Sequence, residues 1–206
     1  EGLLMIEEGV RIEDIDGALT SLGMPIGPIT LLDEVGIDVG AHVMSGNMAE
    51  LLKGREGFKI NYSMPKMFEA GLHGRKAKKG FYNYAMKKGR LRKTSPNQDA
   101  YQHFGNTSPK KIDRKEIEER TMLMLLNEAV WCLEDNILQN PKDGDIGGVF
   151  GVGFLPWSGG PFSYMNLLGL DHVVSRMEHY ASIHGPKFNP RPLLKSMAEK
   201  GEKFIV

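Results

Sequence analysis

The stretch PIGPITLLDEVGID, residues 25–38, has a counterpart later in the same chain, PWSGGPFSYMNLLGLD at residues 156–171. Both copies start with proline, place Gly-Pro ahead of an apolar run, and close on glycine, an apolar residue and aspartate. Proline suits the first position of a helix, because its φ angle is already helical and its missing N–H group is not needed there. We therefore predict that Pro28 and Pro161 each begin a helix, within a helical unit that occurs twice.

The similarity between the two copies extends upstream of these stretches. EGLLMIEEGV at the start of the chain aligns with EAVWCLEDNI, and EDIDGAL aligns with GDIGGVF. The aligned pairs are Glu1 with Glu128, Glu7 with Glu134, Asp14 with Asp145, Pro25 with Pro156, Pro28 with Pro161, Gly36 with Gly169 and Asp38 with Asp171. A repeat this long indicates a duplicated domain rather than a solenoid unit.

We predict three segments on this basis. Residues 1–84 form the first helical repeat, and residues 113–206 form the second. Residues 85–112, which are polar and basic, form a linker between the repeats. The chain opens on apolar residues at helical spacing with no capping residue before Glu1, so we interpret the first repeat as truncated at its N-terminus.

Helical periodicity dominates the sequence and predicts an all-α fold with about four helices in each repeat. Asp14 or Asp16 could cap the helix that follows them in the chain. Residues 28–52 fit either one long helix or two helices with a break near Gly36. A long helix capped by Asp113 and another from Tyr164 to His184 are predicted in the second repeat. FYNYAM at 81–86 could pair with RLRKT at 90–94 as a small hairpin.

Composition excludes several classes of function. The 26 basic and 26 acidic residues give no net charge, which argues against a nucleic-acid-binding protein. One cysteine, Cys132, cannot form a disulfide framework within the chain. No apolar run is long enough to cross a bilayer, and the six histidines show no spacing typical of a zinc site.

The glycine-rich loop GDIGGVFGVGFLPWSGGP, residues 144–161, raises the alternative of a phosphate cradle. The dinucleotide pattern G-x-G-x-x-G fails because Pro156 stands at the third glycine, and the P-loop pattern fails because no lysine follows Gly153. The first copy has fewer glycines in the same position. We therefore expect a connection between helices that turns sharply, since glycine allows close backbone approach.

Two motifs carry a resemblance to a known family. GMPIGPITLLDEVGIDV followed by GLHGRKAKKGFYNY resembles the C-terminal domain of 3-hydroxyacyl-CoA dehydrogenases. The second copy resembles the last domain of the multifunctional α-subunit of the fatty-acid β-oxidation complex. The resemblance implies two tandem copies of a helical domain of the 6-phosphogluconate dehydrogenase C-terminal-like type. In that family an enoyl-CoA hydratase domain and a Rossmann NAD domain precede the two helical copies.

The resemblance also implies the chemistry of the parent enzyme, which oxidises (3S)-3-hydroxyacyl-CoA to 3-ketoacyl-CoA with NAD. The catalytic His–Glu pair, the assisting asparagine and the NAD site of the family match no position in this chain. At the equivalent point in the second copy stands Glu119-Arg120, without an asparagine. We therefore expect no catalytic, cofactor-binding or metal-binding residue here, and no activity from this chain alone. The alternative is a non-catalytic helical scaffold or subunit-interaction domain.

One substrate-binding residue is implied by the resemblance. Phe150 stands where some family members have a tyrosine assigned to substrate binding, so we expect it to contact acyl-CoA, with a core aromatic in the interface between the two copies as the alternative. Nine Lys or Arg residues and no acid lie between His73 and Lys93. They could attract CoA phosphates or an acidic membrane surface, or lie on a solvated linker, while Phe81 and Tyr82 pack against the first copy.

The expected partners follow from the same resemblance. They are acyl-CoA, the upstream Rossmann and hydratase domains of the parent, and a thiolase β-subunit. Neither nucleic acid nor a membrane is expected as a partner. The expected location is the bacterial cytoplasm, with mitochondria or peroxisomes as the alternatives.

Overall fold

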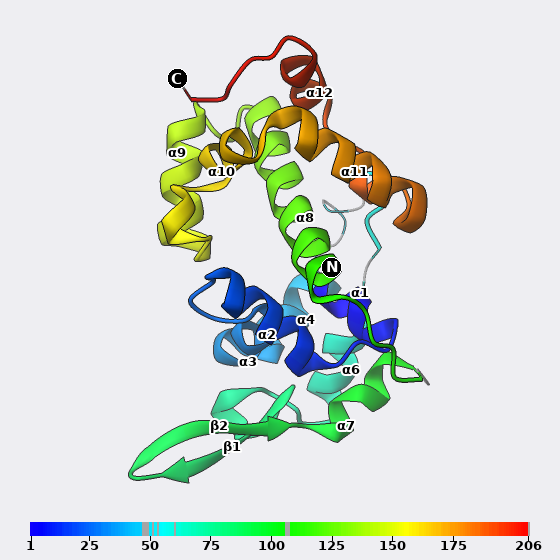
Figure 1. The fold of residues 1–206 in the computed structure, drawn as a ribbon. Coiled ribbons are helices and arrows are strands. Elements are labelled where there is room, and N and C mark those ends of the chain that lie inside the picture. The colour runs from blue at the N-terminus through cyan, green and yellow to red at the C-terminus, as the bar shows by residue number, and fades with distance from the viewer. Residues whose placement is uncertain (47–49, 51, 53, 60, 106–107, 206) are drawn as a thin grey trace. The chain divides into compact units, whose positions relative to one another are not determined.

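The computed structural model describes residues 1–206 except for 47–49, 51, 53, 60, 106–107 and 206 (Figure 1). These residues form two compact units. Unit 1 comprises residues 1–20 and 26–117, and unit 2 comprises residues 21–25 and 118–206.

Unit 1 is built mainly of short helices around an apolar core. Its elements are α1 (Gly2–Glu7), α2 (Ile12–Leu22), α3 (Pro28–Val35), α4 (Ile37–Ser45), α6 (Ser63–Glu69) and α7 (Gln98–Tyr101), with single turns η1 (Arg75–Ala77) and η2 (Gln102–Phe104). Met5, Ile12, Leu19 and Met67 are fully buried in this core. The chain breaks at Gly36, so the alternative of two helices is confirmed for the part of residues 28–52 that the structure describes.

A hairpin completes unit 1, as the sequence predicted. Strand β1 (Tyr82–Lys87) pairs in antiparallel fashion with β2 (Arg90–Pro96). Phe81 and Tyr82 are almost completely buried, which confirms that they pack against the first copy. The segment expected as a linker, residues 85–112, contains part of this hairpin together with α7 and η2, and all of it belongs to unit 1.

Unit 2 begins within a long helix and continues with five shorter helical segments and two single turns. Its elements are α8 (Arg114–Glu134), α9 (Pro141–Gly147), the π-helical turn η3 (Gly148–Val152), η4 (Pro156–Ser158), α10 (Pro161–Leu168), α11 (Leu170–His184), η5 (Pro186–Phe188) and α12 (Pro192–Glu199). The side chain of Asp113 accepts a hydrogen bond from the amide of Lys115, as a capping residue does.

The prediction of one helix from Tyr164 to His184 is wrong. The helix begins at Pro161 and is interrupted at Gly169, whose φ of 88° and ψ of 127° cannot continue a helix. Gly36 separates α3 from α4 in unit 1, and its angles are nearly the same, φ 109° and ψ 130°. Residues other than glycine rarely adopt this region, so both positions require glycine.

The two units share the order of the helices that begin at proline and break at glycine. In unit 1, Pro28 begins α3, Gly36 separates it from α4, and α4 packs against α6. In unit 2, Pro161 begins α10, Gly169 separates it from α11, and α11 packs against α12. The predicted starts at both prolines are confirmed. The fold is mostly helical, with one two-stranded sheet among the described residues.

Candidate functional site

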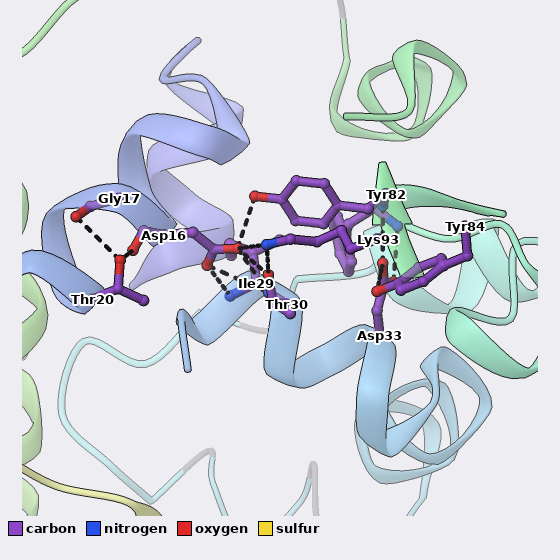
Figure 2. A network of polar contacts seen from close by, with 10 residues as sticks. Asp16, Gly17, Thr20, Ile29, Thr30, Asp33, Tyr82, Tyr84 and Lys93 are labelled. Atoms are coloured by element: carbon purple, nitrogen blue, oxygen red, sulfur yellow. Dashed lines mark hydrogen bonds and ion pairs between the residues drawn. The ribbon is translucent and has the colours of Figure 1, made fainter. Parts of the chain in front are cut away.

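In unit 1 a buried carboxylate organises the start of α3. Asp16 lies on α2, and its Oδ1 accepts a hydrogen bond from the amide of Ile29 at 2.8 Å. Its Oδ2 accepts bonds from the amide of Thr30 at 3.0 Å and from the hydroxyl of Thr30 at 2.5 Å. Tyr82 donates its hydroxyl to the same oxygen at 2.8 Å (Figure 2). The carboxylate therefore satisfies helix amides that have no partner within α3.

Unit 2 repeats this arrangement with a different aspartate from the one that the sequence alignment suggested to be equivalent. Asp145 on α9 accepts from the amide of Phe162 at 2.7 Å, the amide of Ser163 at 3.1 Å and the hydroxyl of Ser163 at 2.6 Å. Its geometric equivalent is Asp16. The pairing of Asp14 with Asp145 is wrong, because Asp14 forms an exposed ion pair with Arg11. Asp16 precedes Ile29 by thirteen residues, whereas Asp145 precedes Phe162 by seventeen. Because the spacing differs, the sequence alignment did not pair these two aspartates.

Each carboxylate cap requires a glycine directly before the proline of the helix. A Cβ atom on Gly27 would lie 2.3 Å from Oδ1 of Asp16, and one on Gly160 would lie 2.5 Å from Cα of Asp145. The Gly-Pro pair of both copies therefore has two separate causes. Glycine leaves room for the carboxylate, and proline begins the helix.

A second pair of equivalent acids lies at the ends of α1 and α8. Glu7 accepts a hydrogen bond from Asn61, whose own Oδ1 accepts the amide of Ser63 at the start of α6. Glu134 accepts from the side chain of Arg191 and from the amide of Leu193 at the start of α12. Each acid holds the segment that enters a later helix of its unit, α6 in unit 1 and α12 in unit 2, so their predicted equivalence agrees with their contacts.

A third acid, Asp33 on α3, fastens the hairpin to the helices of unit 1. It accepts hydrogen bonds from the amides of Phe81 and Tyr82 at 2.9 Å and from the hydroxyl of Tyr84 at 3.0 Å. Burial raises the pKa of this carboxyl, and the three donors oppose that rise. Burial and the nearby carboxylates also raise the pKa values of Tyr82 and Tyr84 above that of free tyrosine. The motif GRKAKKGFYNY is therefore explained by the packing of the hairpin against α3.

The amides that directly follow the glycine-rich loop of unit 2 form hydrogen bonds within that unit. The first amides of α10, those of Phe162 and Ser163, already bond to the carboxylate of Asp145. A Cβ on Gly144 would meet the ring of Phe162, and one on Gly148 would meet Pro161. These glycines therefore serve close packing within the protein, and the start of α10 does not fit the pyrophosphate of NAD.

Phe150, the expected substrate contact, lies in the π-helical turn η3. Phe150 is 86% exposed. Ile146, Val152 and Trp157 in the same loop are also more than half exposed. Such π-helical turns occur often at functional sites, because they displace side chains from the regular helix path.

Trp157 is anchored although its ring is exposed. Its indole Nε1 donates to the carbonyl of Leu22 at 3.0 Å, within unit 2, to which residues 21–25 belong. Its ring packs edge-on against Tyr164, with centroids 5.6 Å apart. A Cβ on Gly23 would lie 2.6 Å from the indole nitrogen, so glycine is needed at that position.

Glu119, which the sequence resemblance aligns with the family's asparagine, belongs to a polar cluster. It accepts hydrogen bonds from Arg176 at 2.5 Å and from the hydroxyl of Tyr180 at 2.9 Å. Burial, and then the hydrogen bond to Glu119, raises the pKa of Tyr180 to about 12. Arg120 is fully buried. Glu119 therefore links α8 to α11 within unit 2.

Eight of the nine cations in the basic stretch from His73 to Lys93 fall into two groups. Four cations contact side chains of unit 1: Arg75 with Glu34, Lys76 with Asp38, Lys79 with Asp99, and Lys93 with Thr30 and Asp16. The cations toward the hairpin turn, Lys87, Lys88, Arg90 and Arg92, are exposed and make no ion pair with any described residue.

No group of three His, Cys, Asp or Glu side chains among the described residues could hold a metal ion. No helix among those residues has the length and the apolar character needed to cross a membrane.

These features define a tandem pair of like helical domains, each with a carboxylate cap and a helix pair broken at glycine. The chain belongs to the family described as 3-hydroxyacyl-CoA dehydrogenase, C-terminal domain, whose model matches residues 1–84 and 117–203. The match therefore covers most of both repeats, and the resemblance that the sequence suggested is confirmed.

The chain is similar to curated proteins named fatty acid oxidation complex subunit alpha. It is 42% identical over 206 residues to the protein from Shewanella sp. strain ANA-3, covering 100% of this chain and 29% of that protein. It is also 42% identical over 196 residues to the one from Vibrio parahaemolyticus, covering 94% of this chain and 26% of that protein. The chain thus spans less than a third of the length of these relatives.

Solved structures support the fold. A crystal structure of 3-hydroxybutyryl-CoA dehydrogenase from Escherichia coli K12 matches with a TM-score of 0.74 at 19% identity, covering 97% of this chain and 57% of that one. The dehydrogenase part of multifunctional enzyme 1 from C. elegans matches with a TM-score of 0.58 at 20% identity, covering 95% and 46%. At these identities the likeness concerns the fold alone.

Proposed function

We propose that this chain is the C-terminal part of a multifunctional enzyme of fatty-acid β-oxidation. The parent oxidises (3S)-3-hydroxyacyl-CoA to 3-ketoacyl-CoA and passes the hydride to NAD. The observation that carries this proposal is the family match over both repeats, together with relatives named as α-subunits of the fatty acid oxidation complex. The repeats proposed as domains are residues 1–84 and 113–206.

In this proposal the chain supplies walls of the substrate cleft and assembly surfaces. NAD would be bound upstream, by a Rossmann domain of the parent, and would accept the hydride there. The described residues support this division, because the amides at the start of α10 are occupied by Asp145. The relatives come from bacteria such as Shewanella and Vibrio, which supports a bacterial cytoplasmic location.

Phe150 is the proposed contact to the acyl-CoA substrate. Its exposure and its place in a π-helical turn leave the ring available for apolar contact with a ligand. Ile183 on α11 is another apolar side chain of unit 2 that is more than half exposed, and it serves as a matched control.

The test uses the parent polypeptide and NADH formation from 3-hydroxyacyl-CoA. We expect the parent to be active and the 206-residue chain alone to be inactive. Phe150→Ala in the parent should raise KM for acyl-CoA several-fold with kcat unchanged, because uniform binding is lost. Ile183→Ala should leave both constants unchanged. An unchanged KM in Phe150→Ala would remove this residue from the substrate site, and an inactive parent would contradict the enzyme assignment.

The second candidate function is a scaffold that binds another subunit, for which a thiolase β-subunit is the proposed partner. The exposed apolar side chains of Ile146, Phe150, Val152 and Trp157 favour it, because proteins seldom leave several such residues uncovered in one loop. Sedimentation of the parent with and without that subunit separates the two functions. If Phe150→Ala weakens subunit association but leaves KM unchanged, the loop is an assembly surface.

A further inference from the structure

The turn end of the hairpin carries a cluster of four cations. Strand pairing places Lys87 opposite Arg90 and Ala85 opposite Arg92. Because paired residues and alternate residues along a strand share a face, Lys87, Arg90 and Arg92 lie on one face of the ribbon. Lys88 follows directly in the turn. We call these four residues the hairpin cations.

The hairpin cations surround a common space. Their side chains line one shallow depression at the end of the ribbon. Within unit 1 the hairpin extends beyond α3 and ends away from the helices (Figure 1). No described carboxylate pairs with any of the four, whereas Arg75, Lys76 and Lys79 nearby each have an acidic partner.

The four hairpin cations do not add to the stability of the folded hairpin. Like charges placed directly opposite each other destabilise a strand pair, and that is the relation of Lys87 to Arg90. Lys88 also adopts a left-handed conformation with φ of 50°, where asparagine or glycine would be more stable. Charges do protect exposed strands from unwanted pairing, but an acid opposite Lys87 would do the same and add an ion pair.

We propose that the hairpin cations form a binding site for a compact soluble anion with two linked phosphates, a diphosphate. Guanidinium groups of Arg90 and Arg92 present paired donors to phosphate oxygens, and the ammonium groups of Lys87 and Lys88 add point charges. A bound diphosphate relieves the repulsion between Lys87 and Arg90. A depression lined by four side chains at the end of one ribbon fits a small anion better than an extended membrane surface. This proposal does not depend on the proposed function.

The test titrates the 206-residue chain with inorganic pyrophosphate in metal-free buffer at low salt. Calorimetry measures affinity, and amide chemical shifts locate the site. We expect shifts confined to residues 85–92. Lys87→Gln combined with Arg90→Gln should weaken binding by about tenfold or more, since two charge-assisted contacts are lost. The matched control neutralises two exposed lysines of unit 2, Lys200→Gln with Lys203→Gln, and should bind as the unchanged chain does.

A further variant separates binding from folding. Arg90→Glu places an acid opposite Lys87, so it should raise the melting temperature while it abolishes pyrophosphate binding. Absence of binding to the unchanged chain, or an equal loss in the control pair, would overturn the proposal. So would equal affinity for monophosphate, because the site would then not select linked phosphates. Binding to phosphatidylglycerol vesicles without binding to pyrophosphate would assign the cluster to a membrane surface instead.

Discussion

The hydroxyl of Tyr82 lies 2.8 Å from Oδ2 of Asp16, and this contact ties the hairpin to the carboxylate cap of α3. The equivalent carboxylate in unit 2, Asp145, accepts its hydrogen bonds within the described residues from Phe162 and Ser163. The two copies therefore share a cap that belongs to the helical repeat, and unit 1 adds a contact through its hairpin. The Asp16 cap consequently supports more of its unit than the Asp145 cap does.

Asp16→Asn should destabilise unit 1 by about 2–3 kcal/mol, because a buried carboxylate with several donors is replaced by a side chain with one acceptor oxygen. Asp145→Asn should destabilise unit 2 by a smaller amount, about 1–2 kcal/mol. The measurement is urea unfolding followed by circular dichroism. Asp14→Asn is the control, because its ion pair with Arg11 is exposed and surface pairs add little. An equal loss in Asp14→Asn and Asp16→Asn would contradict the assignment of the cap.

The pKa of Asp33 is raised in the folded state. This direction determines how its contribution to the free energy of unfolding changes with pH. A carboxyl with a raised folded pKa binds protons more tightly when folded, so its contribution to stability is greatest below about pH 4. That contribution is lost as the pH rises through the folded pKa. The destabilisation caused by Asp33→Asn should therefore shrink between pH 4 and pH 7.

Urea unfolding of both proteins at several pH values measures this difference in the free energy of unfolding. Asp38 is a suitable control acid, because its hydrogen bond with Lys76 lowers its pKa. The destabilisation caused by Asp38→Asn should grow, not shrink, as the pH rises over the acidic range. If the Asp33→Asn penalty also grew with pH, the direction of the Asp33 shift would be wrong.

Tyr180 supplies a prediction at alkaline pH. Its pKa is raised to about 12, whereas an unfolded tyrosine ionises near pH 10. Its contribution is fully present below about pH 10 and is lost as the pH rises toward 12. The stability advantage of the unchanged chain over Tyr180→Phe should therefore be constant from pH 7 to about pH 9.5 and should decrease above it. Unfolding at fixed pH checks this, and absorbance at 295 nm follows the ionisation.

The sequence predicted the fold where a residue has one strong local preference. Pro28 and Pro161 begin helices because proline tolerates few other positions in a helix. Phe81 directly precedes a short strand that contains Tyr82 and Tyr84, and these aromatic residues allowed the hairpin to be predicted. Such signals do not depend on the rest of the chain.

The parts that were missed depend on tertiary contacts. Gly169 ends a helix that is apolar on both sides of the break, and periodicity alone continues through such a point. The equivalence of Asp16 and Asp145 was missed because the loops that follow them differ in length. The only sequence feature that indicated this equivalence is the Gly-Pro pair of each copy, because its glycine leaves room for a carboxylate. The exposure of Phe150 likewise follows from a π-helical turn that has no sequence signature.

Gly160 is the position where the cap of unit 2 is most sensitive to a single methyl group. Its φ is 124°, and a Cβ there would lie 2.5 Å from Cα of Asp145, which is backbone and cannot move aside. Gly160→Ala should therefore cost about 3 kcal/mol or more, from strain and from a displaced cap together. Gly151 in η3 is the matched control, because its φ is not positive and nothing lies within 4 Å of its Cβ position.

Gly151→Ala should be neutral or should stabilise unit 2 by up to about 1 kcal/mol, because alanine lowers the conformational entropy of the unfolded chain. Thermal unfolding of the two variants beside the unchanged chain measures the contrast. Amide exchange at Phe162 and Ser163 then shows whether the cap itself is displaced, since both amides donate to Asp145. If Gly160→Ala unfolds like Gly151→Ala and protects these amides equally, the close approach of residue 160 to Asp145 is not what holds α10 in place.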